Sequence, residues 1–314
     1  MTRQQSSNSI LMVQPTNFEL NVQAVADNYF MNKPDDKIDV PQMALKEFTN
    51  YYNAIKSKGV DIQLFKPADG VETPDCLFPN NWFSTHSKEE MDQESNKETL
   101  CLYPMCHLNR RLERRPNIIE FLKSRYPADQ LNLVDLTESE KDGIYLEGTG
   151  SFVLDRVNRN AYICISQRSH KTLAMEWAQK MGYNLVSFTS VDAHGKVIYH
   201  TNVIMAICSK FAVICLDSVE DVVEKQNLIS TLSKTHTIID ITKEQVNNFC
   251  GNVIEVVGSE NKKYLVASTT AWNAFTEKQQ EQINQLVDGV IAEDIPTIQS
   301  VGGGGIRCMI AELF

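Results

Sequence analysis

A cysteine follows an unusual run of glycines late in the 314-residue chain. Residues 302–305 are all glycine, and Ile306, Arg307 and Cys308 come directly after them. Consecutive glycines allow backbone conformations that other residues avoid, and they let the chain approach a ligand closely. The run lacks the Gly-Lys-Ser/Thr ending of a phosphate loop, and too few residues follow it for the helix of a dinucleotide loop. A turn that presents one cysteine to a cleft fits better than a flexible tail, because an apolar, strand-like run, 306–314, follows.

Three further polar motifs lie at the ends of predicted elements, next to glycine or proline. They are Tyr199-His200-Thr201-Asn202, Leu146-Glu147-Gly148-Thr149-Gly150 and Phe78-Pro79-Asn80-Asn81-Trp82-Phe83. Each alone also has a structural interpretation: a histidine at a strand end, an exposed turn glutamate, and an Asn-Asn turn between aromatic core residues. Together they supply a nucleophile in Cys308, a base in His200 and a carboxylate in Glu147. A thiolate nucleophile needs a nearby base or cation to lower its pKa, and a carboxylate orients the imidazole.

Amphipathic segments with recognisable ends predict the helices that must position these motifs. Five helices are expected at 41–58, 112–125, 171–181, 219–233 and 277–288, and a short sixth helix from Lys243. Capping boxes are expected at Thr242 with Gln245 and at Thr276 with Gln279, and Ser218 is expected to cap the 219–233 helix. Helix starts therefore recur about every 59 residues, a period typical of repeat or propeller-like architecture.

Short runs rich in β-branched residues lie between these helices. Strands are expected at 131–136, 152–155, 161–166, 202–208, 211–216, 252–257 and 263–269. Each unit then runs strand–strand–helix–strand, and about five units follow one another. Paired strands before each helix argue against a Rossmann fold, in which single strands alternate with helices. Since no linker rich in proline, glycine or serine divides the chain, we expect one α/β domain over residues 1–314.

Composition restricts the class of protein. Thirty Lys and Arg against 40 Asp and Glu give a net charge of −10, with 42% hydrophobic and 22% charged residues, as in ordinary globular proteins. The acidic surplus argues against binding to a nucleic-acid backbone, and we interpret Arg110, Arg111, Arg114 and Arg115 as a solvated helix start. No apolar stretch approaches the about 18 residues of a membrane span, and a signal-peptide core is lacking. We therefore expect a cytoplasmic protein with no membrane partner.

The eight cysteines include no CxxC pair. Three lie in apolar, β-branched runs and are expected to be buried thiols: Cys164, Cys208 and Cys215. Cys101 and Cys106, the latter followed by His107, have no second ligand pair at zinc spacing, so no metal site is expected. Among all eight, Cys308 alone has no such structural interpretation.

The order of the motifs resembles the guanidine-modifying, or pentein, superfamily. Its pattern is Phe-x-x-(Asp/Asn), Glu-Gly-x-Gly/Asp, His-x-(Asp/Asn) and then Gly-Gly-Gly-x-x-Cys, and the resemblance covers nearly the whole chain. Members include arginine deiminase, dimethylarginine dimethylaminohydrolase, agmatine deiminase and the amidinotransferases. The resemblance implies a five-bladed ββαβ propeller, in agreement with the repeat above. The FPNNW and EGTGS patterns are most similar to the citrulline utilisation hydrolases.

This resemblance implies roles for individual residues. Cys308 resembles the nucleophile of the superfamily and His200 its general acid/base. Glu147 resembles the carboxylate that positions the histidine. Arg168 resembles the arginine that holds the substrate carboxylate, a contact that a planar guanidinium makes with two hydrogen bonds. No metal or organic cofactor is implied.

Asn81 and Asn202 stand where the arginine-acting members usually have aspartates. Asparagine keeps similar shape and hydrogen bonds but removes the charge that would neutralise a buried guanidinium. Two neutral amides suit a ureido group, so we expect a cysteine hydrolase of linear ureido or amidine compounds that converts L-citrulline to ornithine, carbon dioxide and ammonia. An arginine-type deiminase or amidinotransferase is the alternative. A non-catalytic pentein binding protein is a further one, although such proteins lack the Cys/His/Glu set. The expected partner is a small molecule, and a homo-oligomer is left open.

Overall fold

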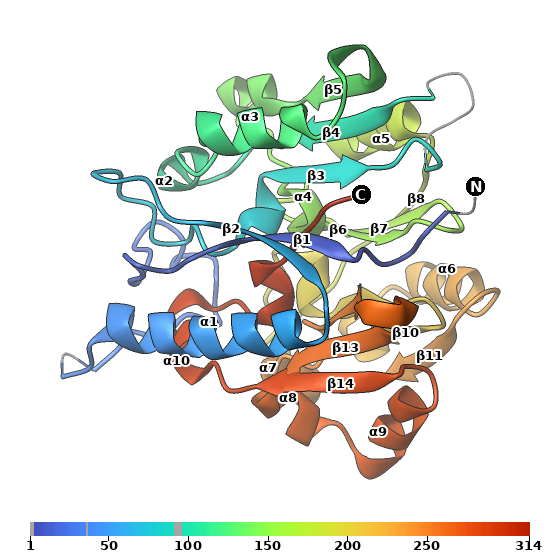
Figure 1. The fold of residues 1–314 in the computed structure, drawn as a ribbon. Helices are drawn as coiled ribbons and strands as arrows, with labels where there is room; N and C mark the ends of the chain where they lie inside the picture. Colours follow the sequence, from blue (N-terminus) through green and yellow to red (C-terminus); the bar gives the residue numbers. More distant parts are fainter. Residues whose placement is uncertain (1–2, 36, 91–95) are drawn as a thin grey trace.

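In the computed structural model, which describes residues 3–35, 37–90 and 96–314, the strands form five three-stranded sheets (Figure 1). Every sheet follows one plan. A first strand pairs antiparallel with a middle strand, and the middle strand pairs parallel with an outer one. In three pairs of neighbouring sheets the first strands contact one another, and we call the first strand of each sheet its inner strand.

The sheets use the strands in a regular order. Listed as inner, middle and outer strand, they are β3 (Phe83–His86), β4 (Glu98–Leu102) and β5 (Leu131–Asp135); β6 (Phe152–Asp155), β7 (Asn160–Cys164) and β8 (Asn184–Phe188); β9 (Met205–Ile207), β10 (Phe211–Ile214) and β11 (Thr237–Asp240); β12 (Ile254–Val257), β13 (Lys263–Ser268) and β14 (Gly289–Glu293); β15 (Ala311–Glu312), β1 (Ser9–Val13) and β2 (Asp61–Phe65).

The last of these sheets joins segments from opposite ends of the sequence. Strand β15 pairs antiparallel with β1, with Leu11 opposite Ala311, and β1 pairs parallel with β2. In Figure 1 the blue β1 accordingly lies beside the red segment that carries β15. This pairing closes the ring of five sheets, and the expected ββαβ propeller of the pentein fold is confirmed.

In each sheet the longest helix between the middle and the outer strand makes the crossover that a parallel pair needs. These helices are α1 (Val40–Ser57), α3 (Pro116–Ser124), α5 (Lys171–Met181), α6 (Val222–Leu232) and α9 (Glu277–Asn284). Shorter helices are α2 (Leu108–Arg111), α4 (Gly148–Ser151), α7 (Lys243–Asn247), α8 (Thr269–Ala274) and α10 (Pro296–Gly302). Single 3-10 turns are η1 (Pro79–Asn81), η2 (Ala128–Gln130), η3 (Thr137–Asp142), η4 (Thr201–Val203), η5 (Leu216–Ser218), η6 (Ser259–Asn261) and η7 (Ile306–Met309).

Two of the three helix caps that the sequence predicts are present. Both expected capping boxes are present, at the starts of α7 and α9. The expected cap at Ser218 is wrong, because that residue ends η5 and the carboxylate of Asp221 accepts from the first N–H groups of α6 instead. The run 306–314 is also less regular than expected, since only Ala311–Glu312 is a strand and η7 precedes it.

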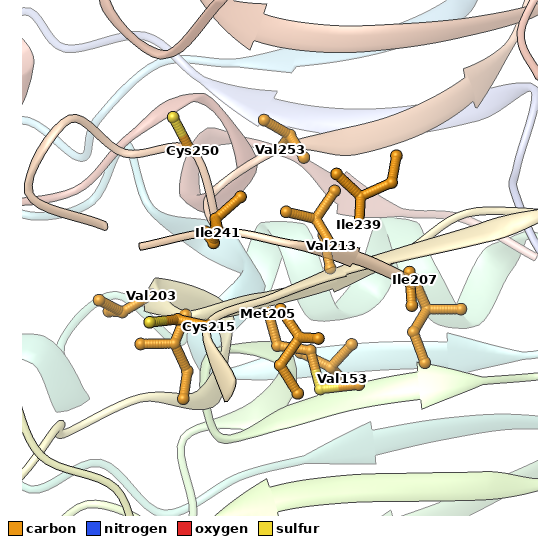
Figure 2. Packing of buried hydrophobic residues seen from close by; sticks show 14 of the residues in the cluster. Val153, Val203, Met205, Ile207, Val213, Cys215, Ile239, Ile241, Cys250 and Val253 are labelled. Carbon is orange, nitrogen blue, oxygen red and sulfur yellow. The ribbon is translucent and has the colours of Figure 1, made fainter. Parts of the chain in front are cut away.

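Apolar side chains from neighbouring sheets fill the space between them. Figure 2 shows one such cluster, in which Val153 of β6, Met205 of β9 and Val213 of β10 pack together with Val253. The thiols expected to be buried are buried, and the eight cysteines form no disulfide among the described residues. No helix in the described part of the chain combines the length and apolar character needed to cross a bilayer.

Candidate active site

A short turn precedes each inner strand, and these turns carry the candidate residues. Asn81 ends η1 before β3, Gly150 lies in α4 before β6, and Asn202 lies in η4 before β9. Asn252 lies two residues before β12, and Cys308 lies in η7 before β15. Since α4 contacts both η1 and η4, and η1 contacts η7, the ring brings these turns together.

His200 and Glu147 form a buried pair. His200 Nε2 lies 2.8 Å from Glu147 Oε2, and the other carboxylate oxygen accepts from the Cys106 N–H at 2.9 Å. Burial alone would raise the pKa of Glu147, but the charge of Arg168 and the hydrogen bond from His200 outweigh it and hold the pKa far below its usual value. An ionised carboxylate only accepts hydrogen bonds. Nε2 of His200 therefore carries a proton, and Nδ1 is left as the basic nitrogen.

The second ring nitrogen of His200 lies beside Asn81. A Cβ atom built on Gly150 would lie 2.7 Å from His200 Nδ1 and 2.4 Å from Asn81 Nδ2. Only glycine fits between these two side chains. Burial lowers the pKa of His200 despite the neighbouring Glu147, so the imidazole is neutral and able to accept a proton.

Cys308 is 8% exposed, and two amides contact its sulfur. Nδ2 of Asn252 lies 3.3 Å from Sγ, and Nδ2 of Asn202 lies 3.6 Å from it. Burial raises the pKa of the Cys308 thiol, and the hydrogen bond from Asn252 and the charge of Arg307 oppose this only in part. The resting thiol is therefore neutral, in contrast to the lowered pKa that the motifs suggested.

Asn252 was not among the residues singled out from the sequence. Its context, Gly251-Asn252-Val253-Ile254, parallels Thr201-Asn202-Val203-Ile204 of the preceding sheet. Besides its contact with Cys308, its Nδ2 donates to the carbonyl of Asn202 at 2.9 Å, and its Oδ1 accepts from the Arg307 N–H at 3.2 Å. Comparison of the turns before successive inner strands would have revealed it.

Asn81 is oriented by a buried arginine. Arg110 Nη1 donates to Asn81 Oδ1 at 2.8 Å, while Glu113 accepts from Nε and Nη2 of the same guanidinium at 2.9 and 3.0 Å. Because a guanidinium can only donate, the Asn81 carbonyl must face Arg110 and its Nδ2 must face the other way. Within the described residues, neither Asn81 Nδ2 nor Asn202 Oδ1 has a hydrogen-bond partner.

The interpretation of the arginine cluster as a solvated helix start is wrong. Arg110 is 3% exposed and ion-paired with Glu113, and Arg115 is also buried. Arg111 and Arg114 pair with Glu140 at 3.4 and 2.6 Å. Three of the four arginines are therefore paired with carboxylates of the protein itself, and Arg115 donates to the carbonyl of Lys66. A glutamate three residues after Arg110 was the available signal, since this spacing places both side chains on one helix face.

Arg168, expected to hold the substrate carboxylate, is engaged by carboxylates of the protein itself. Its Nε donates to Asp27 Oδ2 at 2.9 Å, Nη2 donates to the other oxygen of Asp27, and Nη1 lies 3.7 Å from Glu147 Oε2. The guanidinium also lies 4.7 Å from the ring centre of Tyr199. Asp27 therefore makes the two-bonded contact that the resemblance assigns to a substrate.

Residues around Asp27 lie against the glycine run. Asn28 Nδ2 donates to the Gly302 carbonyl at 3.3 Å, and the ring of Phe30 lies 6.5 Å from that of Tyr199. Tyr199 in turn donates from its hydroxyl to the Gly303 carbonyl at 3.1 Å. This segment thus packs directly on the loop that leads to the cysteine.

The family model for N,N dimethylarginine dimethylhydrolase, eukaryotic, matches residues 14–314. The chain belongs to this family. The resemblance to the guanidine-modifying, or pentein, superfamily is thereby confirmed, and the family is named for a hydrolase of a linear amidino compound, as expected. No curated protein matches the sequence significantly.

Solved structures with the same fold include several of named activity. The apo structure of ArgZ, an arginine dihydrolase from the ornithine-ammonia cycle in Cyanobacteria, has a TM-score of 0.71 at 17% identity, covering 96% of this chain and 40% of that chain. Unliganded AgrE has a TM-score of 0.74 at 17% identity, with coverages of 98% and 39%. A dimethylarginine dimethylaminohydrolase adduct with S-methyl-L-thiocitrulline has a TM-score of 0.64 at 18% identity, with coverages of 96% and 98%. The chain thus spans about two fifths of the full ArgZ and AgrE chains, and at these identities the likeness shows the fold.

Proposed function

We propose that the protein is a cysteine hydrolase that cleaves L-citrulline to ornithine, carbon dioxide and ammonia, with Cys308 as nucleophile. The observation that carries the substrate is the pair of unpartnered amide atoms, a donor on Asn81 and an acceptor on Asn202. Family membership supports the reaction class. The set of Cys308, His200 and Glu147 supports the covalent route.

The two amide atoms, one donor and one acceptor, complement the acceptor and donor groups of a ureido group. Buried polar atoms without partners cost free energy, so a ligand that satisfies both is favoured. A ureido carbonyl can accept from Asn81 Nδ2, and a ureido N–H can donate to Asn202 Oδ1. A guanidinium has only donors, so its N–H groups would meet the amide N–H of Asn81, which Arg110 holds in that orientation. The geometry therefore favours a neutral substrate over a cationic one.

The same residues can carry out a balanced reaction. The Cys308 sulfur attacks the ureido carbon while its proton passes to Nδ1 of His200, and ionised Glu147 stabilises the resulting imidazolium. His200 then returns the proton to the departing amine, which leaves as ornithine. Water attacks the remaining carbamoyl-cysteine, and the thiol and carbamic acid are released. Carbamic acid breaks down to carbon dioxide and ammonia.

Covalent chemistry on proteins of the same fold supports this route. An asparagine-to-serine variant of the ArgZ N-terminal domain was determined covalently bonded to a reaction intermediate. Arginine is the competing substrate, because ArgZ is named an arginine dihydrolase. The two candidates differ in the charge that Asn81 and Asn202 must accommodate.

The test compares kcat/KM for citrulline and arginine by measuring ornithine and ammonia, with agmatine and dimethylarginine in the same panel. Wild-type protein should prefer citrulline. Changing both Asn81→Asp and Asn202→Asp should lower kcat/KM for citrulline by about 10- to 100-fold, because a carboxylate cannot donate to its carbonyl, and should improve guanidinium binding. Cys308→Ala serves as the background control. A wild-type preference for arginine would refute the citrulline assignment and favour the arginine-type alternative.

A further inference from the structure

The side chain of Asn252 connects the turn that carries Cys308 with the turn that carries Asn202. Its Nδ2 lies 3.3 Å from Cys308 Sγ and donates to the Asn202 carbonyl at 2.9 Å. Its Oδ1 accepts from the Arg307 N–H at 3.2 Å. Asn252 is 3% exposed, so all of these contacts are made away from solvent.

Two backbone partners of opposite kind fix the orientation of this amide. A backbone N–H only donates and a backbone carbonyl only accepts, so Oδ1 must face Arg307 and Nδ2 must face Asn202. An amide nitrogen carries two N–H groups, and the Asn202 carbonyl takes one of them. The other N–H is left for the sulfur of Cys308.

Glycines in both turns permit this close approach. A Cβ built on Gly251 would lie 2.4 Å from the Val203 carbonyl oxygen, and a Cβ built on Gly305 would lie 2.6 Å from Asn252 Oδ1. Both distances are too short for a real contact, so a larger residue at either position would displace Asn252 from its partners. The glycine at 305 thus allows the amide to lie directly against the turn of the candidate nucleophile.

We propose that Asn252 is a catalytic residue that donates a hydrogen bond to the Cys308 sulfur while the sulfur carries the negative charge. During attack, the thiol proton passes to Nδ1 of His200 and a sulfur electron pair forms the bond to the substrate carbon, while Asn252 keeps both of its protons. When water hydrolyses the carbamoyl-cysteine, the same N–H donates to the departing thiolate. A hydrogen bond to a charged acceptor is stronger than one to a neutral acceptor, so the contact favours the thiolate over the thiol.

The charges and donors around the sulfur give Asn252 the larger part in this stabilisation. Burial raises the pKa of the Cys308 thiol, and the hydrogen bond from Asn252 opposes this more than the charge of Arg307 does. The charge of Arg307 is also shared, because its Nη2 lies 3.6 Å from Glu312 Oε2. Asn202 Nδ2 is the more distant amide donor, at 3.6 Å from Sγ.

The first test measures alkylation of Cys308 by iodoacetamide against pH, in full-length protein without substrate. Asn252→Ala should react about 10- to 100-fold more slowly at each pH below the thiol pKa, because loss of a donor to the charged form lowers the thiolate fraction. Asn252→Asp keeps an acceptor for the Arg307 N–H and adds a negative charge beside the sulfur, so it should react more slowly still in the alkaline range. The exposed Asn247→Asp is the matched control and should react like wild type. Rates in both Asn252 variants that equal or exceed the wild-type rate overturn the proposal.

Steady-state kinetics separates a catalytic role from a structural one. The kinetic consequence rests on the proposed function for its covalent step, whereas the alkylation test does not. On whichever compound of the substrate panel wild type turns over, Asn252→Ala should lower kcat about 10- to 100-fold with little change in KM, because the contact strengthens only when the sulfur is charged. A change confined to KM overturns the proposal. A wild-type preference for arginine would refute the citrulline assignment and leave the role of Asn252 intact.

Discussion

Cys308 and His200 both lie where their uncharged forms are favoured. Burial raises the pKa of the thiol and lowers that of the imidazole, while Glu147 stays ionised. In the proposed mechanism the proton therefore moves from sulfur to Nδ1 during attack on the substrate and not in the resting protein. Substrate contact with Asn81 and Asn202 would then coincide with formation of the thiolate.

The neutral resting thiol has a measurable consequence for alkylation of Cys308 in substrate-free protein. Below the thiol pKa, each pH unit raises the thiolate fraction about tenfold. The rate of modification by iodoacetamide should therefore keep rising from about pH 6 to beyond pH 9.0, the ordinary thiol value, because burial raises the pKa above it. Peptide mass spectrometry identifies Cys308, and Cys308→Ala measures background labelling. A rate that levels off below neutral pH would contradict the neutral thiol.

At the scale of elements, helix α10 positions the glycine run, because the helix ends at Gly302 and the remaining glycines follow it directly. Its first turn is held by Glu47 of α1, whose buried carboxylate accepts from the Thr297 and Ile298 N–H groups at 2.9 and 3.0 Å. The helix is followed by Gly303 at φ 58°, where a Cβ would lie 2.7 Å from the amide of Asn28. Glycine is therefore required at this position.

Removal of the Glu47 carboxylate should loosen both α10 and the loop that follows it. Glu47→Ala leaves the buried Ile298 N–H and the half-buried Thr297 N–H without their acceptor and should cost about 1–3 kcal/mol of unfolding free energy. It should also lower kcat, because the loop carries Cys308. Glu47→Gln, with one acceptor oxygen, should be intermediate. Urea unfolding and steady-state kinetics test this, with the exposed Gln42→Ala on the same helix as control. If Glu47→Ala and Gln42→Ala had equal unfolding free energies, Glu47 would not stabilise the first turn of α10.

At the scale of the whole molecule, a buried ionic network joins the sheet of β3, β4 and β5 to the sheet of β6, β7 and β8. Glu90 accepts from Arg156 Nη1 at 2.7 Å and from the Tyr183 hydroxyl at 2.9 Å, and its other oxygen lies 3.2 Å from Nδ1 of His86 on β3. Burial alone would raise the pKa of Glu90, but the charges of Arg156 and His86 outweigh it and hold the pKa at about 2.

This network should support stability in a defined pH range. The pKa of Glu90 falls from 4.5 to about 2 on folding, so its contribution is complete above pH 4.5 and disappears as the pH falls towards 2. Glu90→Gln should lose about 3–5 kcal/mol at neutral pH, as when one partner of a buried pair is removed. Denaturant unfolding over a pH series should show wild type and variant converging below pH 4.5. If the difference in unfolding free energy between wild type and Glu90→Gln stayed constant over the pH series, ionisation of Glu90 would not be the source of the stability.

Helix ends and β-branched runs in the sequence predicted the repeated strand–strand–helix–strand unit. They did not predict contacts between residues far apart in the sequence. The helix Lys171–Met181 was predicted to the residue because Gly182 ends it, and the glycine run singled out Cys308. Asp27 could not be placed near Arg168 from the sequence, since 141 positions separate them and only ring closure brings them together. Arg110 was misjudged for a related reason. A charged cluster is solvated by default, and burial depends on a partner such as Asn81 that the fold supplies.

The pairing of β15 with β1 also makes the position of the Cys308 sulfur depend on a strand of two residues. Cys308 lies three residues before β15, and β15 pairs antiparallel with β1, which comes about 300 positions earlier in the sequence. Glu147 and His200 instead lie before the inner strands β6 and β9. The candidate nucleophile is therefore anchored by a contact between two distant segments, and a substitution in either segment can move the sulfur without touching it.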